Sequence, residues 1–398
     1  MHPAGKTLLF LRVWGGPPIA ASVEGMLRRS FPEFEIEAWN IASLVKRRPD
    51  IVAINGWSTL REHTRAVLTG RQRFRTAFFA TTYLFRRVRR LLLDRFLPRR
   101  GEFAATFQLQ SLFDASLPGV PHFVYTDQTA LAYGERIGHG SPRAYRPDWI
   151  ELEREIYRHA TCVLTRSDDI SRSLVEDYRC PPERVSCVYV GCNVPVGPAS
   201  GAVERYQSKE ILFVGTNWEL KGGPELLEAF QRLRLSHPES RLTVIGCNPA
   251  VSVPGCEVLG VLPVGALSPY FQRASVFCLP TREEAFGVAF IEALAHRLPV
   301  VATGINAIPE FVRHGHNGLL VPVRDAAAIA TALETLLSDP ALCQRYGEAG
   351  YAHFRERYNW EAVGSRVRKR VLADLGGANR ERCRQGFFVI ASPGSQPP

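Results

Sequence analysis

Short apolar runs, each followed at once by glycine or polar residues, recur along the first half of the chain. Four of them have the length of buried strands: 7–14, 50–56, 122–127 and 162–167. Helical periodicity is present over 148–160 and over 167–178, and Ser167 offers an N-cap for the second helix. Buried parallel strands are continuously apolar rather than alternating. The first half is therefore predicted to be an α/β domain.

The same rhythm restarts in the second half, after a stretch over 190–208 that is rich in Gly, Pro and small residues, as linkers are. Further strands are expected at 209–215, 240–246, 256–260, 274–280 and 318–323. Helices are expected at 223–236, 325–339 and 359–375. This alternation predicts two doubly wound α/β domains. Such sheets bind ligands beyond the carboxyl ends of their strands, so two facing sheets would form an interdomain cleft.

Composition bounds the class of protein. The chain has 398 residues, enough for two domains, and 45% are hydrophobic. No segment approaches the roughly 20 apolar residues of a membrane span. The N-terminus is interpreted as a first strand rather than a signal peptide. The nine cysteines include no C-x-x-C pair and no zinc spacing, which favours reduced thiols and a cytoplasmic location.

The positive charge of the chain is local. The net charge is +10, and residues 61–100 alone hold twelve arginines against Glu62 and Asp94, which gives 12 − 2 = +10. Apolar residues interleave with these arginines, as in a helix lying on a membrane. We therefore expect contact with an anionic membrane surface, peripheral at its inner face, and no nucleic acid. An ordinary helix pair in an arginine-rich domain is an equally weighted alternative.

The stretch TREEAFGVAFIEALAHRLPVVATG (281–304) contains the first candidate site. Glu284 and Glu292 bracket Phe286 and Gly287 where a helix is expected to begin. A helix N-terminus presents unpaired N–H groups, and a glycine lets a phosphate approach the backbone. Carboxylates can accept two hydrogen bonds from adjacent sugar hydroxyls. Solvated surface charge near a helix N-terminus is the alternative explanation of these acids.

A second loop of the same kind lies in FVGTNWELKGG (213–223). It runs from a strand through glycines to a helix, and Lys221 stands beside Gly222 and Gly223 at the start of that helix. A lysine there can offset phosphate charge. Two phosphate-suited loops in one domain are more informative than either alone.

At this point the chain resembles glycosyltransferase family 4. The resemblance rests on FVGTNWELKGGPELLEAF, LPTREEAFGVAFIEALAHRLPVVATG and GHNGLLVP, and the E-x7-E arrangement matches Glu284 and Glu292. FLRVWGGPP near the N-terminus, the segment 164–194 and RERYNWEAVGSRV (355–367) are similar to other parts of the family. The resemblance covers roughly 350 residues, strongly in the second half. It implies the GT-B architecture, two facing Rossmann-like domains.

The resemblance also implies roles for single residues. Glu284 would contact the transferred sugar near its reacting carbon, and Glu292 would hold the ribose hydroxyls. Lys221 would neutralise the departing diphosphate. The remaining implied donor contacts are backbone groups: Gly15, Gly16, Phe286, Gly287 and Val288.

Two positions depart from the family pattern. Thr216 stands where many relatives carry a second phosphate-binding arginine, which Arg282 could replace. The acceptor-domain histidine of many relatives is absent, and the comparable stretch offers Asp127 and Gln128 instead. Asp127 is a candidate catalytic residue, with a helix N-cap as an equal alternative.

The linker and the resemblance together divide the chain into an acceptor-side domain (1–195), a donor domain (196–355) and a closing helix that crosses back (356–375). The tail over 376–398 is polar and rich in Gly and Pro, so it is expected to be disordered. The resemblance implies transfer with retention from a nucleotide-diphosphate sugar to a glycan or lipid-linked acceptor, with no metal and no other cofactor. The alternative is an inactive GT-B relative that binds sugar nucleotides or acts as a scaffold.

Overall fold

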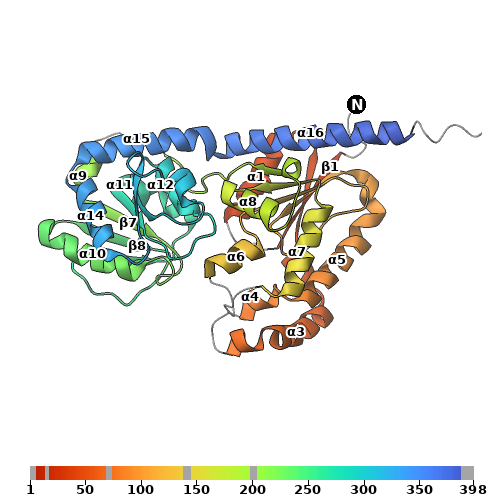
Figure 1. The fold of residues 1–398 in the computed structure, drawn as a ribbon, viewed down its shortest axis with the longest axis horizontal. Helices are drawn as coiled ribbons and strands as arrows, with labels where there is room; N and C mark the ends of the chain where they lie inside the picture. The colour runs from red at the N-terminus through yellow and green to blue at the C-terminus, as the bar shows by residue number, and fades with distance from the viewer. Residues whose placement is uncertain (1–5, 14–17, 69–73, 138–144, 198–203, 387–398) are drawn as a thin grey trace, which may run out of the picture. The chain divides into compact units, whose positions relative to one another are not determined.

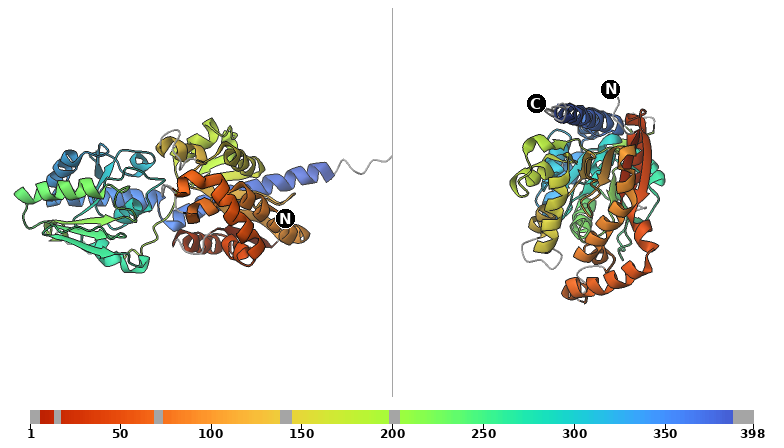
Figure 2. Two further views of the ribbon diagram at one scale, coloured as in Figure 1. Left: turned by 90° about the horizontal axis from the view of Figure 1, so that it is seen from below. Right: turned by 90° about the vertical axis from the view of Figure 1, so that its right-hand side faces the viewer.

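The computed structural model describes residues 6–13, 18–68, 74–137, 145–197 and 204–386. The chain divides into two compact units. Unit 1 comprises 1–165, 171–188 and 364–398, and unit 2 comprises 166–170 and 189–363. Each unit is built around one parallel sheet with helices on both sides of its strands (Figures 1 and 2). The two doubly wound α/β domains predicted from the sequence are therefore present.

The sheet of unit 1 has six parallel strands in the order β2-β1-β3-β4-β5-β6. The bounds are β1 Thr7–Arg12, β2 Glu35–Asn40, β3 Phe103–Leu109, β4 His122–Thr126, β5 Cys162–Thr165 and β6 Val185–Cys187. Every residue of β3 and of β4 is buried, because helices cover both faces. The chain direction across the sheet reverses between β1 and β3, which is where such sheets bind ligands.

The helices of unit 1 connect these strands. They are α1 Pro18–Ser30, α2 Ile41–Lys46, α3 Pro49–Leu68, α4 Phe74–Phe78, α5 Thr82–Phe96, α6 Ala130–Ile137, α7 Pro147–His159 and α8 Asp168–Glu176, with short 3-10 turns η1 Leu97–Glu102 and η2 Pro182–Arg184. Ser167 accepts a hydrogen bond from the N–H of Ile170 at the start of α8, as predicted for an N-cap.

The sheet of unit 2 also has six parallel strands, in the order β12-β11-β10-β7-β8-β9. The bounds are β7 Glu210–Val214, β8 Arg241–Ile245, β9 Cys256–Gly260, β10 Val276–Leu279, β11 Val300–Thr303 and β12 Gly318–Val321. Counted within the unit, this is the Rossmann order 3-2-1-4-5-6 read from its other edge. Its switch point lies between β7 and β10.

Unit 2 contains the helices predicted over 223–236 and 325–339. The first of them, α10, has the predicted bounds. The helices of unit 2 are α9 Glu204–Gln207, α10 Gly223–Ser236, α11 Ser268–Arg273, α12 Val288–Ala295, α13 Ile308–Phe311, α14 Ala326–Leu337 and α15 Pro340–Arg357, with the 3-10 turn η3 Val264–Ala266. Asp325 caps α14 by accepting from the N–H of Ala328 at 2.9 Å.

The strand predicted over 50–56 is wrong. These residues lie inside helix α3. The apolar side chains that suggested a buried strand are mostly exposed, Val52 and Ile54 among them, and Asn55 is buried in their place. An apolar run cannot by itself distinguish a strand from a helix.

The C-terminal prediction was also wrong in its bounds. Helix α16 spans Trp360–Gly386, so residues 376–386 are helical rather than part of a disordered tail. Disorder was expected because the tail is polar and rich in Gly and Pro, but the residues directly after Leu375 are compatible with a helix and the helix continues through them. Residues from Gly364 onward belong to unit 1. The chain passes from unit 1 to unit 2 at 188/189, whereas the predicted domain boundary was 195/196.

No single helix of the described ranges has the length and apolar character to cross a membrane. One pair, Ala326–Leu337 with Pro340–Gly376, passes the same test together but is bent by 99°. The apolar side of α14 is buried within unit 2, at Ile329, Leu333 and Leu336.

Candidate functional site

The loop that follows β7 places Lys221 at the carboxyl edge of the unit 2 sheet. Asn217 fixes its turn, since its side chain accepts from the N–H of Leu220 at 3.0 Å and its carbonyl accepts from the N–H of Lys221 at 2.9 Å. Gly222 is the N-cap of α10, with φ +72°, and a Cβ there would overlap the carbonyl oxygen of Pro280. Glycine is therefore required by both conformation and space.

The loop that follows β10 is held against the first loop. The N–H of Arg282 donates to the carbonyl of Leu220 at 2.8 Å. The buried hydroxyl of Thr281 donates to the carbonyls of Leu220, at 3.1 Å, and Glu283, at 2.7 Å. Asn306 donates to the carbonyl of Glu284 at 2.8 Å. These bonds fix the backbone on which the glutamates stand.

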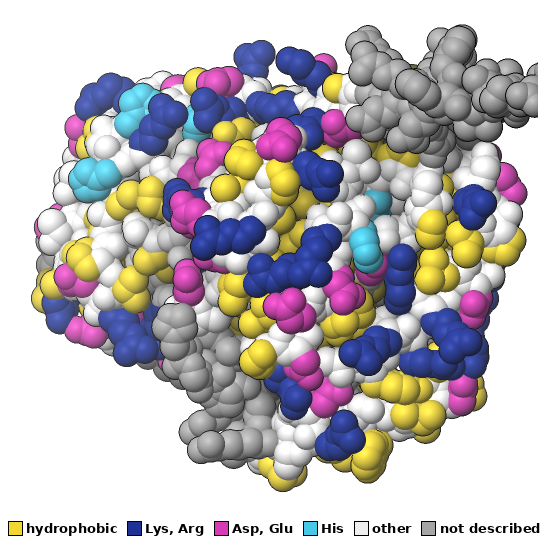
Figure 3. Space-filling view, turned by 45° about the vertical axis from the view of Figure 1, so that its right-hand side comes forward, with side chains coloured by type: hydrophobic (Ala, Val, Ile, Leu, Met, Phe, Trp, Pro, Cys, Tyr) yellow, Lys and Arg dark blue, Asp and Glu magenta, His cyan; other side chains and the backbone are white. Residues whose placement is uncertain are grey.

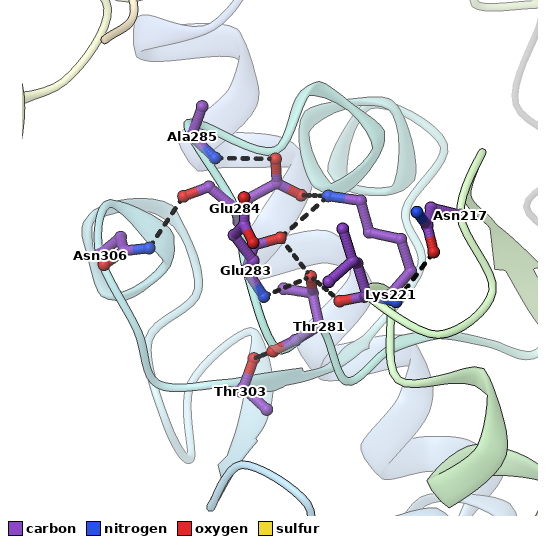
Figure 4. A network of polar contacts seen from close by, with 9 residues as sticks. Asn217, Lys221, Thr281, Glu283, Glu284, Ala285, Thr303 and Asn306 are labelled. Carbon is purple, nitrogen blue, oxygen red and sulfur yellow. Dashed lines mark hydrogen bonds and ion pairs between the residues drawn. The ribbon is translucent and has the colours of Figure 1, made fainter. Parts of the chain in front are cut away.

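Lys221 and Glu284 form an ion pair at the switch point between β7 and β10. Lys221 Nζ lies 2.8 Å from Glu284 Oε2 and also donates to the carbonyl of Glu283 at 3.2 Å (Figure 4). The other carboxylate oxygen of Glu284 accepts from the N–H of Ala285 at 3.1 Å. The side chains keep 19% and 13% of their surface exposed, so both remain accessible to a ligand at the sheet edge.

The N-terminus of α12 lies directly after this pair. Gly287 is its N-cap, with φ +99° and no side-chain cap, so the first N–H groups of the helix have no side-chain acceptor. A Cβ at Gly287 would collide with the ring of Phe290. The side chain of Phe286 is buried against Phe311, so only its backbone can meet a ligand, as it can at Val288.

Glu292 is buried in α12. The structure gives it no hydrogen bond or ion pair with Lys221 or Glu284 within the described ranges. Its carboxylate has the backbone N–H of Asn193 as a hydrogen-bond partner and lies close to Cys192. Burial raises the pKa of Glu292 to about 8. The sequence analysis placed Glu284 and Glu292 in one candidate site because of their spacing. In the structure their side chains have different surroundings.

The other predicted donor residues have mixed outcomes. Thr216 is exposed at the edge of the sheet. Arg282 pairs with Glu225 at 2.6 Å and with Glu219 at 3.5 Å, so its guanidinium is engaged by two acids. It does not stand as a spare cation for a phosphate. Gly15 and Gly16 lie outside the described residues.

Asp127 lines a separate cavity of about 220 Å³ inside unit 1. The cavity lies at the carboxyl ends of β3 and β4. Its lining combines polar residues with aromatic rings: Gln110, Ser111, Thr126, Asp127, Gln128 and Thr129, with Phe79, Tyr145 and Trp149. The hydroxyl of Thr129, not Asp127, accepts from the N–H of Ala132 at the start of α6. The N-cap alternative for Asp127 is therefore wrong.

Glu153 is a residue that the sequence reasoning missed. It is buried at the floor of this cavity and accepts from Ser111 Oγ at 2.6 Å, Ala130 N at 2.9 Å and Tyr157 Oη at 3.0 Å, and from Tyr178 Oη. Burial raises its pKa. A glutamate on the inward side of the helical pattern 148–160 was the available signal. Glu153 joins the loops after β3 and β4, and so positions Asp127 and Gln128.

Comparison with known proteins gives the family of one part of the chain. Residues 208–339 match the family model described as Glycosyl transferases group 1. A D-inositol 3-phosphate glycosyltransferase from Streptomyces bingchenggensis is 29% identical over 264 residues, covering 59% of this chain and 57% of that protein. A phosphatidyl-myo-inositol mannosyltransferase from Mycobacterium tuberculosis is 33% identical over 186 residues, covering 43% and 49%. The chain thus spans about half to three fifths of the length of these relatives.

Solved structures share the whole fold. HepE from Anabaena, in complex with UDP and glucose, has a TM-score of 0.60 at 12% identity and covers 92% of this chain and 98% of that one. Sucrose-phosphate synthase from Thermosynechococcus elongatus has a TM-score of 0.57 at 18% identity and covers 77% and 79%. The two parallel-sheet units therefore have the GT-B fold that the sequence predicted.

Proposed function

We propose that this chain, whose residues 208–339 are a group 1 glycosyl transferase domain, transfers a sugar from a nucleoside diphosphate sugar to a hydroxyl of a glycan or lipid-linked acceptor. The observation that carries the proposal is the Lys221–Glu284 pair at the switch point of the unit 2 sheet. Rossmann-like sheets bind nucleotides at that point. The names of the relatives and the UDP bound to HepE agree with a nucleotide sugar as donor.

Lys221 has the chemistry for the leaving diphosphate. Breaking the glycosidic bond places negative charge on the departing oxygen, and a preorganised cation stabilises that charge in the transition state. Glu284 holds Nζ at 2.8 Å before the donor binds, so the cation is already in place. The bare N–H groups at the start of α12 supply further donors for phosphate oxygens. With these groups the reaction needs no divalent metal.

Glu284 is proposed to meet the sugar. It keeps one oxygen on Lys221 and the other on its own loop, and both can accept from sugar hydroxyls when the lysine turns to phosphate. Glu292 is proposed to hold the ribose hydroxyls through its carboxyl oxygens. Transfer with retained configuration is part of the proposal, and the anomeric proton signals of the product test it.

The acceptor is proposed to bind in the cavity of unit 1. Its hydroxyl-rich wall and aromatic rings suit a sugar, whose polar edges seek hydrogen bonds and whose C–H faces lie on rings. Asp127 would accept the proton or hydrogen bond of the attacking hydroxyl. Glu153 acts through the loop that carries Asp127 and is a positioning residue.

Donor consumption tests the proposal. A panel of nucleotide sugars is incubated with the protein, and release of nucleoside diphosphate is followed. We expect one donor to be consumed, and Lys221→Ala and Glu284→Ala to lower the rate by about 100- to 1000-fold. Lys209→Ala is the control, because Lys209 pairs with Glu239 away from this loop. Equal rates in all variants, or no consumption of any donor, would reject the proposal.

A further inference from the structure

Helix α3 has its polar side turned inward. Asn55, Ser58, Thr59 and His63 are buried. Asn55 donates to the carbonyl of Phe78 at 2.8 Å and accepts from the hydroxyl of Thr81. His63 donates to the carbonyl of Ala80 at 3.3 Å. Asn55 and His63 thus bind α3 to the end of α4 and to the segment between α4 and α5.

Glu62 completes this attachment. Its two carboxylate oxygens accept from the N–H and the hydroxyl of Thr82, at 3.0 and 3.1 Å, at the first residue of α5. Breaking these bonds would leave buried polar groups unpaired, which is costly. The rotation of α3 about its own axis is therefore fixed.

The outward side of α3 is apolar. Ile54, Trp57 and Leu60 follow one another at intervals of three residues and are exposed, Trp57 by 63%. Leu68, beyond the kink at His63, is 75% exposed. Soluble helices have the opposite arrangement. Clustered exposed apolar side chains of this size mark an interaction surface.

Helix α5, by contrast, is already used by the fold. Its apolar residues Leu84, Val88, Leu92 and Phe96 are buried in the core of unit 1. Several of its arginines have partners. Arg89 pairs with Asp114 at 3.2 Å, and Arg95 lies 4.0 Å from the ring of Trp39. The arginine-rich segment therefore does not offer α5 as an amphipathic surface.

The exposed charged residues on α3 and just before it are mostly cations. Lys46 and Arg47 are exposed just before the helix and have no acidic partner among the described side chains. Arg61 lies over the ring of Trp57 at 5.4 Å. The exposed acid nearby, Asp50, is neutralised by Arg48 at 2.7 Å. Figure 3 shows one face of the molecule, on which hydrophobic side chains lie among Lys, Arg, Asp and Glu side chains.

We propose that the outward side of α3, formed by Ile54, Trp57, Leu60 and Arg61 with Lys46 and Arg47, docks on an anionic lipid surface. Tryptophan and leucine enter the interface, and the cations meet the headgroups. This partner fits better than a second copy of the chain, since two such surfaces would bring their like charges together.

The position of α3 links this surface to the acceptor cavity. Phe79 and Ala80 line the cavity, and the carbonyls of Phe78 and Ala80 accept hydrogen bonds from the inner side of α3. One helix, about 10 Å across, therefore separates the cavity wall from the docking surface. Resting on the proposed function, this selects the lipid-linked class of acceptor over a soluble glycan.

Vesicle flotation tests the docking surface. The full chain is mixed with phosphatidylcholine vesicles, with and without phosphatidylglycerol. We expect flotation with the anionic vesicles only, and a loss of partitioning of about tenfold or more in Trp57→Glu/Leu60→Glu. The control is Leu235→Glu, which changes an apolar residue that is 88% exposed on α10 and should float like the wild type.

Two further readouts separate the possible failures. Equal flotation of wild type and Trp57→Glu/Leu60→Glu overturns the proposal, as does a wild-type dimer in sedimentation that the same variant dissociates. Shift of the unfolding temperature by nucleoside diphosphates should be unchanged in the variant. If no nucleoside diphosphate shifts the unfolding temperature of the wild type, the donor proposal fails. The flotation result still decides whether α3 docks on anionic lipid.

Discussion

At the scale of single residues, the two glutamates of the E-x7-E spacing are chemically different. Glu284 is partly exposed and paired with Lys221, whereas Glu292 is buried with one backbone N–H as partner. The sequence predicted both as acids near a helix N-terminus. It did not predict their difference, because that depends on Cys192 and Asn193, which are about a hundred positions away in the chain.

This difference predicts how stability depends on pH. The pKa of Glu292 is raised in the folded chain from 4.5 to about 8. The unfolded chain therefore loses its proton first, and the stability that comes from the protonated form is full below pH 4.5 and is lost as the pH rises through 8. Between these values the free energy of unfolding falls by up to about 1.4 kcal/mol for each pH unit.

Urea unfolding of Glu292→Gln against pH measures this effect. Glutamine cannot ionise, so the variant should lose less stability than the wild type from pH 5 to pH 8. If the two proteins lose stability in parallel, Glu292 is already ionised in the folded chain, and burial does not raise its pKa.

At the scale of elements, Gly222 lies where the loops after β7 and β10 meet. A side chain there would need a left-handed conformation and would overlap the carbonyl of Pro280. Gly222→Ala should lower the free energy of unfolding by about 2 kcal/mol or more. Gly265→Ala is the matched control, since nothing lies within 4 Å of a Cβ at that position. A change of similar size in both variants, measured by chemical unfolding, would contradict this explanation of the loop.

Elements differ in how far the sequence determines them. Helix α10 was predicted with its bounds, because a proline near its start and a regular apolar pattern mark it. Strand β3 was missed, although all of its residues are buried, because FAATFQL contains small and polar residues that pack only in the sheet. The run 50–56 was assigned as a strand because a short apolar run is typical of a buried strand. In the structure these residues belong to α3, whose apolar side chains are exposed, against the usual pattern of a soluble helix.

At the scale of the whole molecule, the two units share one architecture but not one strand order. The sequence predicted two α/β domains from the alternation alone. It placed Lys221 and Glu284 just after strand ends. The strand order brings these ends together, because β7 and β10 are hydrogen-bonded neighbours although their last residues, Val214 and Leu279, are 65 positions apart in the chain. The cavity of unit 1 could not be predicted, because Glu153, Ser111 and Ala130 meet only when three separate segments fold.

The central claim is that Lys221 holds the diphosphate of an activated sugar. Titration calorimetry of UDP, GDP and ADP against the wild type, Lys221→Ala and Lys209→Ala tests it most directly. One of these nucleotides should bind the wild type and Lys209→Ala alike, and should bind Lys221→Ala at least about tenfold more weakly. Equal affinity for Lys221→Ala and the wild type would contradict it.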